Sequence, residues 1–146
     1  MRGTVRYAPY LKIPMQKLLF ILSIALLLIN GLGALYGGGN LMIYPDGSGF
    51  GMPLSLLACT PFHNFLIPGI ILFVANGVSS IVVCTALLLN IRGSWWLVMA
   101  QGAVLVGWIV IQVILIQGVG FLHFLFGFVG LALIVAAWLR LNRKNV

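Results

Sequence analysis

Two histidines and one carboxylate have the most versatile chemistry in this chain. His63 follows a proline-rich stretch, His123 lies in an apolar segment, and Asp46 is the single acidic residue. Imidazole and carboxylate groups commonly ligate zinc, and histidines from two helices can hold a haem iron. The same residue types also bond loop carbonyls or close turns. The sequence leaves both roles open, with no cofactor as the expectation.

A second group of polar side chains lies inside otherwise apolar segments. Gln101, Trp108 and Gln112 are spaced to share one face of a helix, and Asn76 lies near mid-depth of the preceding apolar segment. Such groups commonly join neighbouring helices by hydrogen bonds worth roughly 0.6–2 kcal/mol each. Alternatively, they line a pocket for a quinone, a lipid or another amphipathic ligand.

The usual catalytic signatures are missing. The chain has no G-x-S-x-G, no H-E-x-x-H, no P-loop and no paired carboxylates. No Asp, Glu, Lys or Arg falls within the long apolar segments, where ion-coupled transporters usually carry ionisable groups. We therefore expect neither an enzyme nor an energised transporter.

The composition defines the class of protein. Of the 146 residues, 62% are hydrophobic and only 6% are charged, whereas soluble domains carry roughly 25% charged residues. Such a chain cannot cover a water-facing surface, so we expect an integral membrane protein whose first partner is the lipid bilayer. The net charge of +7 comes without a basic patch interleaved with aromatic residues, which excludes a nucleic-acid partner.

Four apolar segments are long enough to cross a bilayer core of ~30 Å. They predict an all-α, four-helix membrane bundle that forms one transmembrane domain over residues 1–146. The first segment also resembles a signal peptide, but its length favours a retained helix. We expect the glycines at 37–40 to end it. The spans are expected at about 18–36, 65–89, 95–116 and 121–139.

The basic residues predict the orientation, because cytoplasmic loops are enriched in Lys and Arg. Both termini and the 90–94 turn are expected on the cytoplasmic side, and Asp46 on the other. This arrangement predicts a multi-pass protein of the bacterial inner (cytoplasmic) membrane, with further contacts to anionic lipid headgroups. The cations are Arg2, Arg6, Lys12, Lys17, Arg92, Arg140, Arg143 and Lys144.

The expected extracytoplasmic loop, residues 37–64, is longer than the 2–8 residues that usually join neighbouring helices. Pro45-Asp46-Gly47 predicts a turn within it, and residues 54–58 predict a short helix. Long loops are often functional, so we expect this one to bind a partner protein or an amphipathic ligand. The candidate binding residues are Tyr44, Asp46, His63, Asn64 and His123.

Several short motifs resemble a group of small, uncharacterised bacterial four-span membrane proteins. The chain is also similar in size and span count to DoxX-type membrane proteins, some of which are associated with redox partners. The resemblance implies a four-span fold and transfers no activity, cofactor or site. The motifs are Pro45-x-Gly47, Gly51-x-Pro53, Thr60-Pro61-Phe62, Pro68-Gly69, Gly77 and Trp108-x-x-x-Gln112.

Three functional hypotheses follow. The first is a non-enzymatic membrane protein that binds a partner or an amphipathic ligand through the loop. The second is a membrane redox component that holds haem or metal at His63 and His123, with Asp46 as a further metal ligand, or quinone along the Gln101–Gln112 face. The third is a passive channel or carrier. Small-residue pairs at Gly33/Gly37 and Ala103/Gly107 fit packing within the chain or a homo-oligomer.

Overall fold

The computed structural model describes residues 14–142, and these residues form helices and turns without a strand. Four helices are long and apolar enough to cross a membrane: α1 (Met15–Ile43), a second long helix (Leu66–Leu88), α4 (Ser94–Ile116) and α5 (Phe121–Asn142). The predicted all-α fold with four membrane-length helices is confirmed, and the chain is a multi-pass membrane protein. The cations that lie outside the described residues are Arg2, Arg6, Lys12, Arg143 and Lys144.

The second long helix contains three segments. It begins as α2 (Leu66–Ile71), continues as the π-helical segment η3 (Leu72–Val78), and ends as α3 (Ser79–Leu88). The side chain of Asn64 accepts the N–H of Leu66 at 3.1 Å and caps the helix. Pro68 lies in the first turn, where its missing N–H costs no hydrogen bond. Pro68-Gly69 therefore lies within the first turns of this helix.

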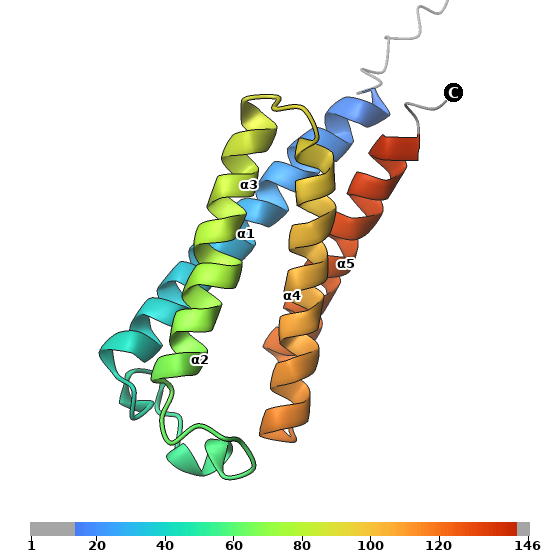
Figure 1. Ribbon diagram of the computed structural model, residues 1–146. Helices are drawn as coiled ribbons and strands as arrows, with labels where there is room; N and C mark the ends of the chain where they lie inside the picture. Colours follow the sequence, from blue (N-terminus) through green and yellow to red (C-terminus); the bar gives the residue numbers. More distant parts are fainter. Residues whose placement is uncertain (1–13, 143–146) are drawn as a thin grey trace, which may run out of the picture.

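The four long helices form a ring in which sequence neighbours are antiparallel (Figure 1). α1 packs against the second long helix and against α5, and α4 packs against α5 and α3. The second long helix and α5 are thus at opposite corners. We call the end with the start of α1, the α3–α4 turn and the end of α5 the terminal end. The opposite end, with residues 44–65 and 117–120, is the loop end.

Burial is distributed unevenly along the ring. α1 buries residues along its length, from Leu19 to Leu41. In α4 all the buried residues lie between Ser94 and Leu105, and in α5 between Val129 and Ala137. The main core, which includes Leu27, Val98 and Leu133, therefore belongs mostly to the terminal half. On the loop side, residues 106–116 of α4 and 121–128 of α5 bury no side chain.

The segment between α1 and α2, residues 44–65, is folded back on the bundle. The N–H of Gly47 bonds the carbonyl of Tyr44 at 3.0 Å, which confirms the predicted turn. Two 3-10 turns follow, η1 (Ser48–Phe50) and η2 (Leu54–Leu57), the second at the place where a short helix is predicted. Leu57 and Phe65 pack with Leu41 of α1 in a second, smaller core. The segment is therefore a structured cap.

The expectation that glycines end the first span at 37–40 is wrong, because α1 continues to Ile43. A Cβ on Gly38 would lie 2.6 Å from the backbone nitrogen of Phe73 and 2.7 Å from the carbonyl oxygen of Gly69. Each glycine costs a helix about 1 kcal/mol relative to alanine. The close packing of α1 on the second long helix offsets that cost.

Close helix approaches occur at other glycines than the predicted pairs. A Cβ on Gly102 would lie 2.7 Å from the carbonyl oxygen of Gly130, so α4 and α5 meet backbone to backbone. Gly33 and Gly37 make looser contacts, to Phe126 at 3.4 Å and to Leu72 at 3.5 Å. Nothing lies within 4 Å of a Cβ on Gly107, and Ala103 is exposed. The Ala103/Gly107 pair therefore makes no helix contact within the described chain.

The glycines of α1 give a matched test of this packing. Gly38→Ala should lower the free energy of unfolding by roughly 1–3 kcal/mol, because the new methyl group meets backbone atoms that cannot move aside. Gly39→Ala should be neutral or stabilising by up to about 1 kcal/mol, since the nearest atom to its Cβ, in the ring of Phe73, lies 3.8 Å away. Unfolding in mixed detergent micelles, followed by circular dichroism, measures both. Equal losses for the two variants would contradict the close approach at Gly38.

Candidate functional site

A polar cluster lies at mid-depth, where η3 meets its neighbours. The π-helical turn bonds the N–H of Ser79 to the carbonyl of Val74, five residues earlier. The carbonyl of Ala75 instead accepts the side-chain amide of Gln101 in α4 at 3.2 Å. The Ser79 hydroxyl lies 2.8 Å from Oε1 of the same glutamine. Gln101 therefore joins α4 to the second long helix, as one of the two interpretations of the polar face predicts.

Asn30 makes the corresponding connection from α1. Its side-chain amide donates to the hydroxyl of Ser80 at 2.8 Å and to the carbonyl of Asn76 at 3.4 Å. Asn30 and Ser80 are both buried. Side chains from two different helices thus supply donors to consecutive carbonyls of the π-helical segment, in a region without bulk water.

The side chain of Asn76 and the indole of Trp108 differ from Asn30 and Gln101, because they make no hydrogen bond between helices. Asn76 is fully buried, yet neither its side-chain nitrogen Nδ2 nor its side-chain oxygen Oδ1 has a hydrogen-bond partner among residues 14–142. The indole nitrogen of Trp108 is also buried without a partner within these residues. A buried polar group left without a partner costs about 1–3 kcal/mol. Both groups are thus competent to bond a polar atom that the protein does not supply.

Trp108 lies in the loop-side half of α4, where residues 106–116 bury no side chain in the bundle. Trp108 is two turns from Gln101 toward the loop end, and Gln112 is one turn farther, and both are half-buried. α4 packs against α3 and η3 but makes no comparable contact with α2. Figure 1 shows α4 diverging from the second long helix toward this end, where η2 approaches α4.

The polar residues of the loop are largely engaged in local structure. Asp46 accepts the hydroxyl of Ser48 at 2.7 Å and its N–H at 3.1 Å. These bonds hold the pKa of Asp46 below its ordinary value, with the hydroxyl making the larger contribution. Asn64 accepts the first N–H of α2. All four loop candidates are exposed, and Tyr44 and His63 are the two whose side chains make no hydrogen bond within residues 14–142.

The predicted histidine site is not assembled from these residues. His63 precedes α2 and His123 begins α5, on helices at opposite corners of the ring. Nδ1 of His123 accepts the N–H of Gly120 at 3.0 Å, so in neutral imidazole Nε2 carries the proton and offers no lone pair. Within residues 14–142, no three His, Cys, Asp or Glu side chains are close enough to hold a metal together.

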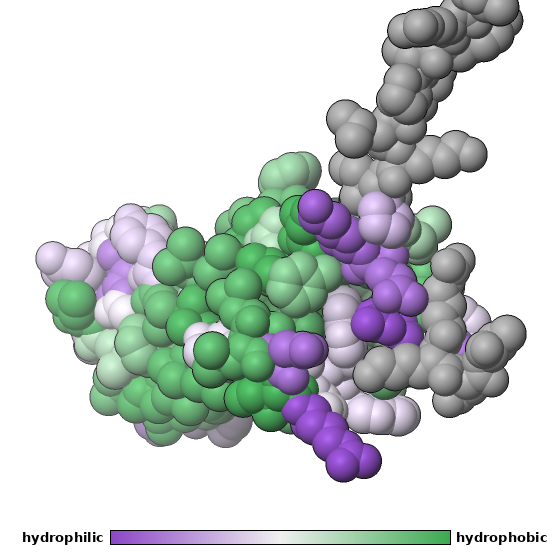
Figure 2. Space-filling view, turned by 90° about the horizontal axis from the view of Figure 1, so that it is seen from above, coloured by the Kyte–Doolittle hydropathy of each residue, from purple (hydrophilic) through white to green (hydrophobic). Residues whose placement is uncertain are grey.

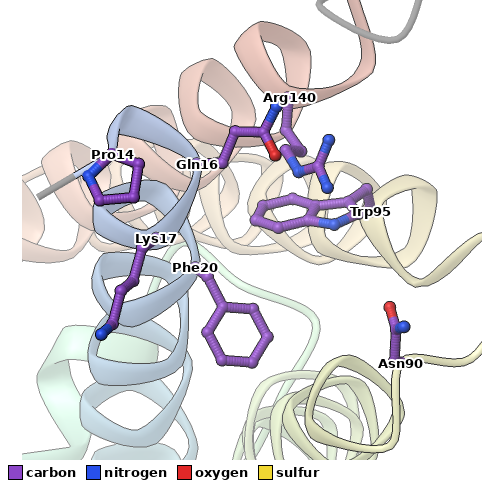
Figure 3. Close-up of a pocket in the computed structure, with 7 residues that line it drawn as sticks. All are labelled: Pro14, Gln16, Lys17, Phe20, Asn90, Trp95 and Arg140. Atoms are coloured by element: carbon purple, nitrogen blue, oxygen red, sulfur yellow. The ribbon is translucent and has the colours of Figure 1, made fainter.

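Sequence reasoning missed a cavity of about 350 Å³ at the terminal end (Figure 3). Its walls come from α1, the α3–α4 turn, α4 and α5, so no local motif encodes it. Two sequence features pointed to it: Trp95 in the first turn of α4 and Arg140 in the last turn of α5. The lining residues are Pro14, Gln16, Lys17, Phe20, Asn90, Trp95 and Arg140.

Comparison with family models, curated proteins and solved structures gave no match. The resemblance to small four-span proteins therefore stays a prediction, and the site is interpreted from the chain's own residues.

The interhelical role of Asn30 can be measured directly. Asn30→Ala should lower the free energy of unfolding by roughly 0.6–2 kcal/mol, the range for hydrogen bonds between membrane helices. Thr85→Ala is the matched control, because that hydroxyl is exposed and donates within its own helix to the carbonyl of Ile81. Its effect should stay within about 0.5 kcal/mol. Detergent-induced unfolding of both variants, monitored by tryptophan fluorescence, distinguishes the two cases, and equal effects would rule out the Asn30 connection.

Proposed function

We propose that this is a non-enzymatic integral membrane protein that binds an amphipathic ligand between the second long helix and α4. The ligand lies in the loop-end half, beneath the 44–65 segment. The observation that carries the proposal is two of the buried polar groups without a partner in residues 14–142, the side-chain amide of Asn76 and the indole N–H of Trp108; Ser23 Oγ and Asn40 Oδ1 are the others.

The two groups specify the polar part of the ligand. An indole N–H only donates, so Trp108 requires an acceptor such as a carbonyl, ester or ether oxygen. The amide of Asn76 both donates and accepts. With a rise of 1.5 Å per residue, Trp108 lies about 10 Å along the helix from Gln101, which is level with the η3 carbonyls. A quinone ring or the glycerol-ester region of a lipid carries oxygen atoms that bond such groups.

The apolar part of the ligand has the loop-side half of α4 to pack against. Residues 106–116 bury no side chain in the bundle, and their apolar members are half-buried or exposed. Leu57 is buried in the cap, and η2 approaches α4, so the cap encloses one end of this region. The exposed side chains of Tyr44 and His63 then face an entering ligand or a partner protein.

The proposal includes an orientation. Lys17, Arg92 and Arg140 are all at the terminal end, and Asp46 is at the loop end. The excess of cations favours a cytoplasmic terminal end in a bacterial inner membrane. The 44–65 segment and its ligand entrance are then extracytoplasmic.

Two cysteines test this orientation. Cys59 is exposed in the 44–65 segment, and Cys84 is buried in α3. In intact cells, a membrane-impermeant maleimide should label the wild-type protein and Cys84→Ser equally, and Cys59→Ser should remain unlabelled. Labelling of Cys59 only after the membrane is permeabilised would invert the proposed orientation.

The ligand itself is tested through the indole N–H. Trp108→Phe keeps the aromatic ring and removes the donor, so affinity should fall about 2–10-fold, the value of one neutral hydrogen bond. Trp96→Phe is the matched control, because Trp96 is exposed at the opposite end of α4. The measurements are the retention of co-purifying lipids and quinones by mass spectrometry and the binding of a decyl-tailed benzoquinone.

A diazirine-bearing lipid locates the binding region on the chain. Photolabelling should concentrate on residues 106–116 of α4 and decrease when the decyl benzoquinone is present. Uniform labelling of all lipid-facing helices, with equal affinities for Trp108→Phe and Trp96→Phe, would contradict the proposal.

A further inference from the structure

The cavity at the terminal end has a lining suited to an anion with an apolar attachment. Arg140 and Lys17 contribute cationic groups, Gln16 and Asn90 contribute amides, and Phe20 contributes an apolar wall. The residues come from four different elements and line one open hollow of about 350 Å³, within the size range of small-molecule sites.

Arg140 is held in place at the wall of this cavity. Its guanidinium carbon lies 5.7 Å from the ring centroid of Trp95, a cation–π geometry. Trp95 is only 7% exposed and belongs to the main core. The aromatic ring therefore fixes one face of the guanidinium, while its N–H groups stay available at the edge. Figure 3 shows the amide of Gln16 extending from α1 toward Arg140.

The cations at this end have no carboxylate side chain to neutralise them. The single acidic residue of the sequence, Asp46, is at the loop end and bonds Ser48. α5 ends at this cavity, and Arg140 in its last turn offsets the partial negative charge there. Among residues 14–142, no side chain caps the first turn of α1. The site is therefore electropositive.

The cavity also lies at the depth of lipid headgroups. Lys17 directly precedes the apolar run that begins at Leu18, and Arg140 directly follows the apolar run that ends at Leu139. Tryptophan residues gather at the same boundary in membrane proteins. Figure 2 shows the molecule from the terminal end. Much of the surface of the described residues is hydrophobic in this view, and strongly hydrophilic residues gather on one part of it.

We propose that this cavity binds the phosphate group of an anionic phospholipid in the leaflet at the terminal end. Arg140, oriented by Trp95, donates to the phosphate oxygens, and Lys17 adds charge at the rim. Gln16 and Asn90 bond the polar group beyond the phosphate, and the acyl chains leave along Phe20 and the apolar surface of α1. This site is separate from the proposed ligand region at the loop end and does not depend on it.

Lipid binding by the purified full-length protein tests the assignment. Native mass spectrometry from micelles with equal amounts of phosphatidylglycerol and phosphatidylcholine measures which lipid is retained. Wild-type protein should prefer phosphatidylglycerol, and Arg140→Gln should weaken that binding about ten-fold, as expected for a charge-assisted hydrogen bond. Arg92→Gln is the matched control, because Arg92 is an exposed cation of the same end that does not line the cavity.

A second variant separates binding from folding. Lys17→Gln leaves the Arg140–Trp95 contact intact and should weaken phosphatidylglycerol binding by less than Arg140→Gln but more than Arg92→Gln. Arg140→Lys should retain part of the affinity, because the charge remains while the planar fork is lost. Helical content by circular dichroism should be unchanged in all four variants, and added salt should weaken wild-type binding.

Three results would overturn the proposal. Equal losses for Arg92→Gln and Arg140→Gln would mean that only the net charge of this end matters. Equal retention of both lipids would exclude recognition of an anionic headgroup. Displacement of phosphatidylglycerol by glycerol 3-phosphate at equal concentration would assign the site to a soluble phosphate compound.

Discussion

A backbone carbonyl at mid-depth in a membrane must find its donor within the protein, because hydrocarbon supplies none. The π-helical segment Leu72–Val78 makes this requirement acute, since its wider turns alter the regular pattern of backbone bonds. Gln101 from α4 and Asn30 from α1 supply donors to two consecutive carbonyls. The second long helix is thereby joined to both of its neighbours in the ring. These bonds connect α4 to α1 through the second long helix, and α5 connects the same two helices on the other side of the ring.

The same connection divides the bundle into two differently packed halves. Near mid-depth, α4 and α5 meet at Gly102 and Gly130, and both helices contribute to the main core. On the loop side, α1 and α2 meet at Gly38 and Gly69, and the 44–65 segment adds its own small core. At the loop end, the close backbone approaches therefore join α1 to the second long helix and do not join α4 to α5. The polar cluster lies at mid-depth, between these two regions. It includes Asn76, whose side chain has no hydrogen-bond partner in residues 14–142, and Trp108, which also lacks one, lies farther toward the loop end.

The sequence predicts the long helices well, because uninterrupted apolar runs bounded by polar residues have few other structures in a membrane protein. It fails at the glycines of residues 37–39, where the local cost of glycine indicates a helix end and the distant backbone of Phe73 favours continuation. The sequence predicts that Gln101, Trp108 and Gln112 share one face of α4. It does not predict that Gln101 bonds the second long helix, because that bond depends on the π-helical segment η3. Nothing in the apolar run from Leu72 to Val78 marks a π-helical turn. The cavity at Arg140 and Trp95 is beyond sequence reasoning because its walls are far apart in the chain.

The order of the helices around the ring has a consequence for biosynthesis. Every member of the polar cluster belongs to the first three membrane-length helices, since Gln101 lies in α4. The cluster can therefore assemble as soon as α4 has left the ribosome and entered the bilayer, while α5 is still being made. α5 then closes the ring by packing between α1 and α4. Arg140 lies in its last turn, so the terminal cavity is completed only after α5 has been made. A ribosome that stops before α5 releases a connected three-helix intermediate in which the terminal cavity lacks Arg140.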